Sequence, residues 1–335
     1  MSAEQPVEQV EQVEVEETQS AHFAPRATFV GHNAAIESIE IDNEHNYLVS
    51  ASRDKSALVW KLNRTQEQWA TPFTRLIGHN HFVSDVSLSR DASHLLTSSW
   101  DSTLRLWDLS TRTTKKLFLG HKKDVLGVTF SPCNRRIISV GRDNQVKIWN
   151  ILGENKAELQ CSSWVTSVAC APMADETSPL VIAVGCWDGK VYIWSIEKEA
   201  KLIKEFKAHD GRCTSVDFTP DGKWVITGGS DRKVVMWLTE NGAKTISFTT
   251  PSPVHAVAAC PTQAWICAAT YEGIAVWDIG AKQQIDLVQP NFKHEGKRNA
   301  GRTPDCTCLA WAADGSVLYS GYNDGSIRAW EVKSA

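Results

Sequence analysis

"SSWDSTLRLWDLS", residues 98–110, places a tryptophan six positions after an aspartate, and this arrangement recurs along the chain. Seven units align on the tryptophan: SRDKSALVW (52–60), SWDSTLRLW (99–107), GRDNQVKIW (141–149), CWDGKVYIW (186–194), SDRKVVMW (230–237), ATYEGIAVW (269–277) and YNDGSIRAW (322–330). Successive tryptophans of these units lie 40 to 53 residues apart. Repetition at about 40 to 45 residues is typical of four-stranded propeller blades.

The residues just before each tryptophan alternate in character. Positions one and three before it are apolar, as in Leu106 and Leu104, whereas position two before it varies among Leu, Arg, Lys, Tyr, Val and Ala. A period of two indicates a β-strand. The sequence therefore predicts an all-β protein built from seven similar units.

A second spacing is stricter. In four units a histidine stands 28 residues before the tryptophan and 22 before the aspartate, and a Ser or Thr stands four before the aspartate. We expect the imidazole to donate to the carboxylate, the hydroxyl to bridge, and the indole N–H to find an acceptor, because buried polar groups need partners. The set resembles a catalytic triad only in composition, since its repetition favours a structural role. The residues are His32, Ser50, Asp54 and Trp60; His79, Thr97, Asp101 and Trp107; His121, Ser139, Asp143 and Trp149; and His209, Thr227, Asp231 and Trp237.

The fourth, sixth and seventh units lack this histidine. The same count back from the tryptophan reaches Thr166, Thr249 and Arg302, and the sixth unit has Tyr271 where an aspartate is expected. We expect these blades to depend more on packing. The structural residues they retain are Asp188, Trp194, Trp277, Asp324 and Trp330.

The two ends of the chain predict how the ring closes. "PRATFVGH" (25–32) reads as an outer strand, because each later "GH" follows one, whereas the last unit ends at Trp330 in a third strand. The N-terminal strand should therefore complete the last blade of a domain spanning 26–335. Loss of residues 26–30 should open the ring.

The first 20 residues differ from the rest, with six Glu and no Lys or Arg in a chain of net charge −4. Such a segment buries too little apolar surface to fold, so residues 1–24 are predicted to be a disordered acidic tail. An acidic arm that binds a partner is the alternative. Neither a signal peptide nor an apolar stretch of about 20 residues appears, which predicts an intracellular protein.

Residue chemistry gives little sign of a metal or a reaction. The nine cysteines form no CxxC pair, which favours reduced thiols over a zinc site. Phosphate-binding loops, dinucleotide fingerprints and nucleophile elbows are missing from the sequence as well. We therefore expect no enzymatic activity, cofactor, metal or small-molecule substrate.

The recurring GH, Asp and Trp motifs resemble the WD40 repeat family over roughly residues 26–335. This resemblance implies a seven-bladed β-propeller, a closed ring with short, protected sheet edges. Several stretches also resemble one subfamily, the receptors for activated C kinase. They are SASRDK (50–55), GHNHFVSDV (78–86), SSWDSTLRLWDLS, GHKKDVLGVTFS (120–131), CAAT (267–270) and SGYNDG (320–325).

The subfamily resemblance implies a non-enzymatic cytoplasmic scaffold on the small (40S) ribosomal subunit. Such a scaffold binds rRNA and ribosomal proteins and presents its surfaces to protein kinases and translation factors. "TISFTT" (245–250) lacks the tyrosine with which animal members dock a kinase, so binding of kinase C is not assumed. The alternative is a G-protein-β-like or other WD40 interaction subunit off the ribosome. "VEQVEQVEVEE" is too short and valine-rich for the coiled coil of a G-protein β subunit.

The docking pair of that subfamily corresponds to Arg53 and Lys55. Both flank Asp54 in a turn between strands, so both cations should project outward, where phosphates of folded RNA can reach them. A solvated surface charge is the plainer interpretation for the other RNA-binding candidates. These are Arg64, Lys122, Lys123, Arg135 and Arg136.

Two further sets of residues are candidates for binding partner proteins. Trp100 and Trp187 precede turn aspartates, and exposed aromatic side chains are enriched at interfaces, although most tryptophans outside the repeated position should pack inside blades. The stretch 287–305 reads as a mobile basic loop, with a plain solvated loop as the alternative. Its candidate residues are Lys293, Lys297 and Arg298.

Overall fold

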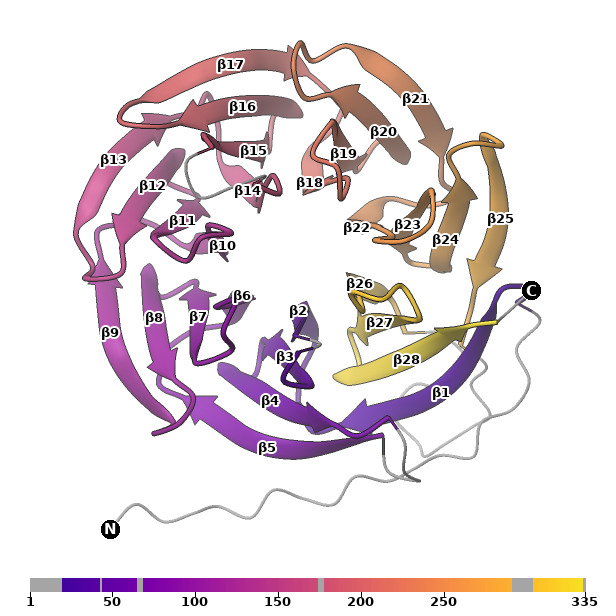
Figure 1. Cartoon of the computed structure of the whole chain (residues 1–335), viewed down its shortest axis with the longest axis horizontal. Helices are drawn as coiled ribbons and strands as arrows, with labels where there is room; N and C mark the ends of the chain where they lie inside the picture. Colours follow the sequence, from indigo (N-terminus) through magenta and orange to yellow (C-terminus); the bar gives the residue numbers. More distant parts are fainter. Residues whose placement is uncertain (1–19, 43, 65–68, 174–177, 291–303, 334–335) are drawn as a thin grey trace.

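The computed structural model describes residues 20–42, 44–64, 69–173, 178–290 and 304–333. Within them, 28 strands form seven four-stranded antiparallel sheets, arranged as blades around a central axis (Figure 1). The predicted all-β, seven-bladed propeller is confirmed. No helix in this described part is long and apolar enough to cross a membrane.

The blades follow the chain in order, each running from an inner to an outer strand (Figure 1). Blade 1 contains β2 (Ile36–Asp42), β3 (Tyr47–Ser52), β4 (Ser56–Leu62) and β5 (Ala70–Ile77). Blade 2 contains β6 (Val83–Leu88), β7 (His94–Ser99), β8 (Thr103–Asp108) and β9 (Thr113–Leu119). Blade 3 contains β10 (Val125–Phe130), β11 (Arg136–Gly141), β12 (Gln145–Asn150) and β13 (Asn155–Gln160). Blade 4 contains β14 (Val165–Cys170), β15 (Leu180–Cys186), β16 (Lys190–Ile196) and β17 (Ala200–Lys207).

The remaining three blades complete the ring. Blade 5 contains β18 (Cys213–Phe218), β19 (Trp224–Gly229), β20 (Lys233–Leu238) and β21 (Lys244–Thr249). Blade 6 contains β22 (Val254–Ala259), β23 (Trp265–Thr270), β24 (Gly273–Asp278) and β25 (Gln283–Val288). Blade 7 contains β26 (Cys306–Trp311), β27 (Val317–Tyr322), β28 (Ser326–Val332) and, as its outer strand, β1 (Phe23–Val30).

Ring closure follows the prediction, because β1 pairs antiparallel with β28, in a register that places Phe29 opposite Ile327. The predicted tail, however, extends too far. Residues 20–24 belong to the folded ring, since Phe23 is fully buried and its ring lies 6.1 Å from those of Trp265 and Trp311. Residues 1–19 of the predicted tail lie outside the described residues.

Hydrophobic clusters join neighbouring blades. One cluster combines Phe29 and Tyr319 of blade 7 with Leu48 and Trp60 of blade 1, all four buried. Burial of each large apolar side chain contributes roughly 1.5–3 kcal/mol relative to exposure. Successive side chains of a strand point to opposite faces of its sheet. Each blade can therefore present apolar side chains to the neighbouring blade on either side.

Hydroxyl groups also link the blades. The inner strand of each blade carries a β-bulge after its first residue. The hydroxyl of the bulge residue Thr166 lies 2.9 Å from the Gly185 carbonyl of its own blade and 2.6 Å from the Cys213 carbonyl of the next. Equivalent bridges to the next blade are made by Ser84, Thr214 and Thr307.

Candidate functional site

The four predicted polar networks are present in blades 1, 2, 3 and 5. In blade 1, His32 Nδ1 lies 2.7 Å from Asp54 Oδ2, His32 Nε2 lies 2.8 Å from Ser50 Oγ, and Trp60 Nε1 donates to the same Oγ at 3.1 Å. The other three networks have the same connections at 2.7–3.0 Å. The glycine before His32 is also explained, because a Cβ on Gly31 would lie 2.7 Å from Trp60 Cη2.

These networks serve as structural supports. Because Nδ1 of each histidine faces a carboxylate, it carries the proton, and Nε2 then accepts a hydrogen bond from the hydroxyl. Each hydroxyl consequently donates to an imidazole and accepts from an indole. All four hydroxyls, those of Ser50, Thr97, Ser139 and Thr227, are fully buried. A nucleophile needs access to a substrate, so these hydroxyls are unsuited to catalysis.

The network carboxylates of blades 1, 2 and 3 are held in their charged form. Burial acts to raise the pKa of Asp54, but hydrogen bonds from His32 and Ser56 outweigh it and hold that pKa well below its usual range. Asp101 and Asp143 show the same direction of pKa shift, with burial opposed by their histidines. In blade 5, burial lowers the pKa of His209 despite the nearby Asp231. The pKa shifts therefore favour the charged form of Asp54, Asp101 and Asp143 and the neutral form of His209.

Two residues predicted to replace the missing histidines lie elsewhere. Position 166 is the bulge residue of β14, and Cys161 occupies the histidine position, four residues before the strand. The β14–β15 connection is longer than its counterparts, so a count of 28 residues back from Trp194 stops five residues short of this position. In blade 6 the β23–β24 turn is shorter, so Thr250 takes the place expected for Thr249. Arg302 lies outside the described residues.

Blades 4 and 7 satisfy their polar groups with other hydrogen bonds, and the tryptophan of blade 6 packs against an aromatic ring. In blade 4, Asp188 accepts a hydrogen bond from Ser162 Oγ at 2.5 Å. In blade 7, Trp330 Nε1 donates to Ser320 Oγ at 2.8 Å. In blade 6, Trp277 stacks on Phe248 with ring centroids 5.3 Å apart.

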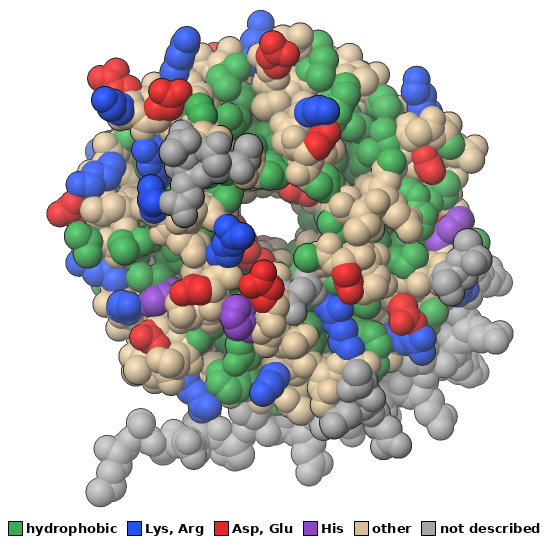
Figure 2. Space-filling view, viewed as in Figure 1, with side chains coloured by type: hydrophobic (Ala, Val, Ile, Leu, Met, Phe, Trp, Pro, Cys, Tyr) green, Lys and Arg blue, Asp and Glu red, His purple; other side chains and the backbone are tan. Residues whose placement is uncertain are grey.

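The His–Asp pairs also define two faces of the ring. Each pair joins an inter-blade connection to a turn between the second and third strands of a blade, so these segments lie on one face, which we call the first face. Turns between first and second strands, and between third and fourth strands, lie at the opposite strand ends, on the second face. Lys and Arg side chains are interspersed with Asp and Glu side chains on the face drawn in Figure 2, so charge alone does not single out a surface there.

Arg53 is exposed on the first face, in the β3–β4 turn. Its guanidinium donates to Glu37 and lies 5.7 Å from the centroid of the Phe82 ring. Burial raises the pKa of Glu37, while the charge and hydrogen bond of Arg53 act to lower it. Glu37 is the bulge residue of β2, where four other blades have a bridging Ser or Thr. Blade 1 thus uses this position to orient Arg53, and the sequence reading missed Glu37.

Lys55 is also exposed on the first face, but its backbone is unusual. Its φ is 70°, in the left-handed region, where the corresponding turns of blades 4 and 7 have Gly189 and Gly325. A side chain in this conformation costs roughly 1–2 kcal/mol. Among the described residues its ammonium has no ion-pair partner. The turn therefore holds an unpaired cation at a position where glycine would be more stable.

The structure divides the other RNA-binding candidates between the two faces. Lys122 and Lys123 are exposed on the first face, in the connection before β10. The candidates on the second face are Arg64, Arg135 and Arg136. Arg64 pairs with Asp314 at 3.3 Å, and Arg136 donates to the carbonyls of Ile196 and Glu197 at 3.0 and 2.5 Å. Of these candidates, only Arg53, Lys55, Lys122 and Lys123 therefore share one face, and we call these four residues the cationic sector.

The two tryptophan candidates belong to a stack of rings and guanidinium groups on the first face. The Arg142 guanidinium lies 4.4 Å from the Trp100 ring centroid and 5.2 Å from that of Trp164. The Trp164 ring lies 5.2 Å from that of Trp187. Trp100 is half-buried, whereas Trp187 is 44% exposed. Lys293, Lys297 and Arg298 lie outside the described residues.

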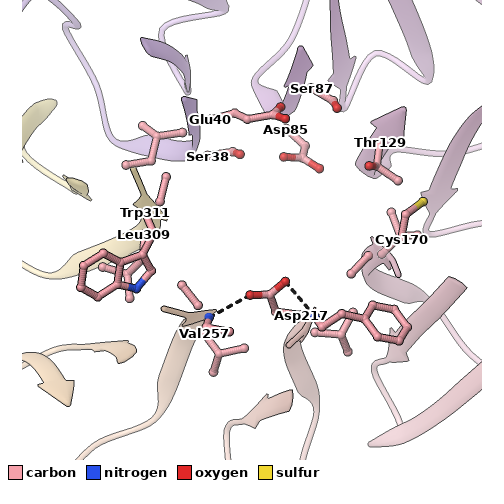
Figure 3. Close-up of a pocket in the computed structure, with 18 of the residues that line it drawn as sticks. Ser38, Glu40, Asp85, Ser87, Thr129, Cys170, Asp217, Val257, Leu309 and Trp311 are labelled. Atoms are coloured by element: carbon pink, nitrogen blue, oxygen red, sulfur yellow. Dashed lines mark hydrogen bonds between the residues drawn. The ribbon is translucent and has the colours of Figure 1, made fainter. Parts of the chain in front are cut away.

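The central channel contains a cavity of about 520 Å³ lined by inner strands. Glu40 and Asp85 lie on one side of it and Asp217 lies opposite (Figure 3). Their carboxyls accept hydrogen bonds from backbone N–H groups of the next blade, at Leu88, Val128 and Ala259. Burial raises the pKa of Glu40 to about 8 and those of Asp85 and Asp217 to about 6. The channel acids therefore fasten adjacent blades.

The nine cysteines, all within the described residues, are free thiols. Burial raises the pKa of the Cys213 and Cys308 thiols to about 12, which makes them unreactive. No group of three or more His, Cys, Asp or Glu residues in this described part could hold a metal ion.

Comparison with known proteins identifies the repeat. The family model described as "WD domain, G-beta repeat" matches residues 23–61, 70–108, 112–150, 153–195, 200–237 and 296–331. The six matched segments correspond to every blade except blade 6, which lacks both the histidine and the aspartate of the network.

Relatives similar over nearly the whole chain are found in fungi. One, from Neurospora crassa, is named "Small ribosomal subunit protein RACK1" and is 39% identical over 92% of this chain and 97% of its own. "MST50-interacting protein 11" of Pyricularia oryzae is 38% identical with the same coverage of both chains. "Cross-pathway control WD-repeat protein 2" of Flammulina velutipes is 38% identical over 91% of this chain and 96% of its own. The chain belongs to the WD40-repeat family, and within it to the receptors for activated C kinase.

Proposed function

We propose that this protein is a non-enzymatic cytoplasmic scaffold on the small ribosomal subunit. It binds rRNA and ribosomal proteins there, and it recruits protein kinases and translation factors. The name of the Neurospora crassa relative supports the ribosomal assignment. The observation that carries it is the β3–β4 turn, in which Glu37 orients the exposed Arg53 and a left-handed backbone holds Lys55 without an ion-pair partner among the described residues.

Phosphate groups fit this turn best. Lys55 has no ion-pair partner among the described residues, and Lys122 and Lys123 add two further exposed cations. Release of counterions from RNA would drive such binding and make it sensitive to salt. Folded RNA is recognised by the positions of its phosphates rather than by base sequence, which suits a few fixed cations.

The test replaces Arg53→Asp together with Lys55→Glu and measures co-sedimentation with small ribosomal subunits. We expect binding to fall at least tenfold at low salt, because two phosphate contacts become repulsive. The control is Arg232→Asp with Lys233→Glu, which makes the same charge change in blade 5, at the residue that corresponds to Lys55 and at the first residue of β20. Undiminished co-sedimentation of the folded Arg53–Lys55 variant would contradict the proposal. Wild-type protein that never travels with small subunits would favour a WD40 interaction subunit off the ribosome.

Recruitment of partner proteins is proposed for the exposed end of the aromatic stack. Trp187 presents a large, partly exposed ring that Arg212 holds in place, with its guanidinium 5.1 Å from the ring centroid. Pre-organised Trp and Arg side chains are common energetic centres of interfaces. Trp187→Ala should reduce the partners recovered with the ribosome-bound protein, as counted by mass spectrometry, and leave co-sedimentation unchanged. Recovery of the same partners would remove Trp187 from the proposal.

A further inference from the structure

The repeated fold reveals an exposed aliphatic rim beside the cationic sector. The last residue of the outer strand is Val30, Ile77 and Leu119 in blades 7, 1 and 2, and these side chains are 48%, 67% and 68% exposed. The same position holds Gln160, Lys207 and Thr249 in blades 3, 4 and 5, and in blade 6 the register places the exposed Gln289, just after β25, there. Exposed aliphatic side chains at this position are thus confined, among the described residues, to three consecutive blades.

The rim and the cationic sector adjoin. Ile77 pairs with Ser56, the residue after Lys55, and Leu119 precedes Lys122 by three residues. A peptide that binds the rim and the cationic sector together would carry aliphatic and acidic side chains close together in sequence. Burial of the aliphatic groups would stabilise the contact in a way that salt does not weaken, whereas the ion pairs would be screened.

The N-terminal segment of this chain has that composition. Residues 7–17, VEQVEQVEVEE, intersperse four valines with five glutamates, and a sixth glutamate stands at position 4. No Lys or Arg precedes Arg26. The segment therefore complements the rim in apolar character and the cationic sector in charge.

The segment also starts close enough to reach this surface. It joins the described structure at Ser20, whose hydroxyl donates to Asp286 at 2.6 Å, just before β1. Strand β1 is the outer strand of blade 7, which adjoins blade 1 in the ring (Figure 1). Nineteen extended residues span about 60 Å, roughly twice the length of the eight-residue strand β1. Tethering raises the effective concentration of the segment to the millimolar range, so weak contacts suffice.

We propose that residues 1–19 dock on the rim of Val30, Ile77 and Leu119 and the adjoining cationic sector when no ligand is bound. The acidic segment then occupies the cations that would otherwise contact phosphate, and it is displaced when RNA binds. Docking depends only on this chain, whereas its effect on RNA binding rests on the proposed function. The segment thereby restricts the scaffold to ligands that bind strongly enough to displace it.

The experiment compares the full chain with a variant that lacks residues 2–19 and with a variant in which all six glutamates of the segment are changed to Gln. The probe is a fluorescein-labelled RNA hairpin, titrated by fluorescence anisotropy at about 50 mM and 300 mM salt. We expect both variants to bind about fivefold more tightly than the full chain at low salt, with the difference shrinking at high salt. Equal affinities at low salt would overturn the proposal.

A rim variant separates docking from general charge repulsion. Ile77→Ser with Leu119→Ser in the full chain should move RNA affinity toward that of the deletion variant, because the segment loses its apolar contacts. The matched control is Leu202→Ser, an exposed aliphatic residue in the outer strand of blade 4, 45% exposed, which should change nothing. If the rim variant leaves the effect of the deletion intact, the segment acts by long-range charge alone and the docking proposal is wrong.

Hydrogen exchange tests docking without RNA. Backbone amides of residues 53–57 and 119–123 should exchange more slowly in the full chain than in the variant lacking residues 2–19, as measured by mass spectrometry. If this protection is present but neither protein binds RNA or small subunits, docking stands and the proposed function fails. Identical exchange in the two proteins would refute docking even if RNA binding is confirmed.

Discussion

Blades 1, 2, 3 and 5 contain the complete His–hydroxyl–Asp–Trp network, whereas blades 4, 6 and 7 do not, yet all seven sheets have the same four strands. The buried position that holds the bridging hydroxyl shows this difference. It is Thr97 in blade 2, whereas blade 4 has Val184 at the same position. Where a histidine is present, its ring nitrogen and the indole both need that hydroxyl. Where the histidine is replaced, as by Cys161, an aliphatic side chain fits. The network is therefore one of several ways to stabilise a blade. Its histidine, hydroxyl and tryptophan each depend on the presence of the others.

Blade 7 provides the strongest test of this comparison, because it depends on β1 rather than on a histidine network. Deletion of residues 20–30 should prevent formation of a stable ring, since it removes an outer strand and the buried Phe23 and Phe29. The cost should exceed the total stability of about 5–15 kcal/mol typical of a folded domain. Circular dichroism and thermal melting provide the measurement. Deletion of residues 2–19 is the control, and a cooperative transition in the longer deletion would contradict the closure role of β1.

A single substitution in blade 2 tests the interdependence of the network. Thr97→Val should lower the free energy of unfolding by about 2–3 kcal/mol, because His79 and Trp107 each lose a buried partner. Denaturant unfolding measures the change, with Thr71→Val on the exposed face of β5 as a matched control. Valine is already present at the equivalent position in blade 4. If Thr97→Val lowers the free energy of unfolding by less than about 0.5 kcal/mol, the residues of the network can be replaced one at a time and are not interdependent.

The channel acids should respond to pH in the opposite sense to the network aspartates. Burial raises the pKa of Glu40 to about 8, so the folded protein holds this proton more tightly than the unfolded chain does. Its contribution to stability is complete below about pH 4.5 and is lost as pH rises toward 8. Glu40→Gln keeps an oxygen acceptor for the Leu88 N–H and should be more stable than wild type at pH 8 by about 1–2 kcal/mol. The free energies of unfolding of wild type and Glu40→Gln are compared at pH 5 and pH 8. The same difference between the two proteins at both pH values would count against the raised pKa of Glu40.

The smallest expected effect concerns the turns between the second and third strands of blades 1 and 2. The left-handed position of this turn is Lys55 in blade 1 and Ser102 in blade 2. Lys55→Gly should stabilise the protein by about 1 kcal/mol, since glycine adopts the left-handed conformation without strain. The same variant should weaken co-sedimentation with small subunits. Ser102→Gly, with φ of 67° in blade 2, should give a similar stabilisation and no change in binding. Loss of binding in both variants would point to turn rigidity rather than the Lys55 charge.

The fold could be predicted from the sequence because each blade repeats the same physical requirements. The Trp spacing, the strand alternation and the final unit that lacks an outer strand together implied a ring closed by β1. Positions predicted by a fixed count failed where a connection changed length, as at Thr166. The histidine position lies at a constant distance before the inner strand. A count back from the tryptophan misses this position wherever a connection between the two has a different length.

The candidate site was less accessible to sequence reasoning. Arg53 and Lys55 were found from a resemblance, but Arg64 and Arg136 were grouped with them although they lie on the second face. Successive connections along an antiparallel sheet alternate between its ends, so strand order could have separated these residues. Glu37 could have been found by aligning the inner strands, since it stands where Ser84, Thr166, Thr214 and Thr307 stand in other blades.

The pairing of β1 with β28 has a consequence for synthesis on the ribosome. The partner of β1 follows it by about 300 residues in the sequence, so it is synthesised much later. Until then β1 has no sheet to join, and both it and the exposed edge of the growing array are open to wrong pairings. Closure of the ring therefore waits for β28, and β1 finds its place in a sheet long after it is made.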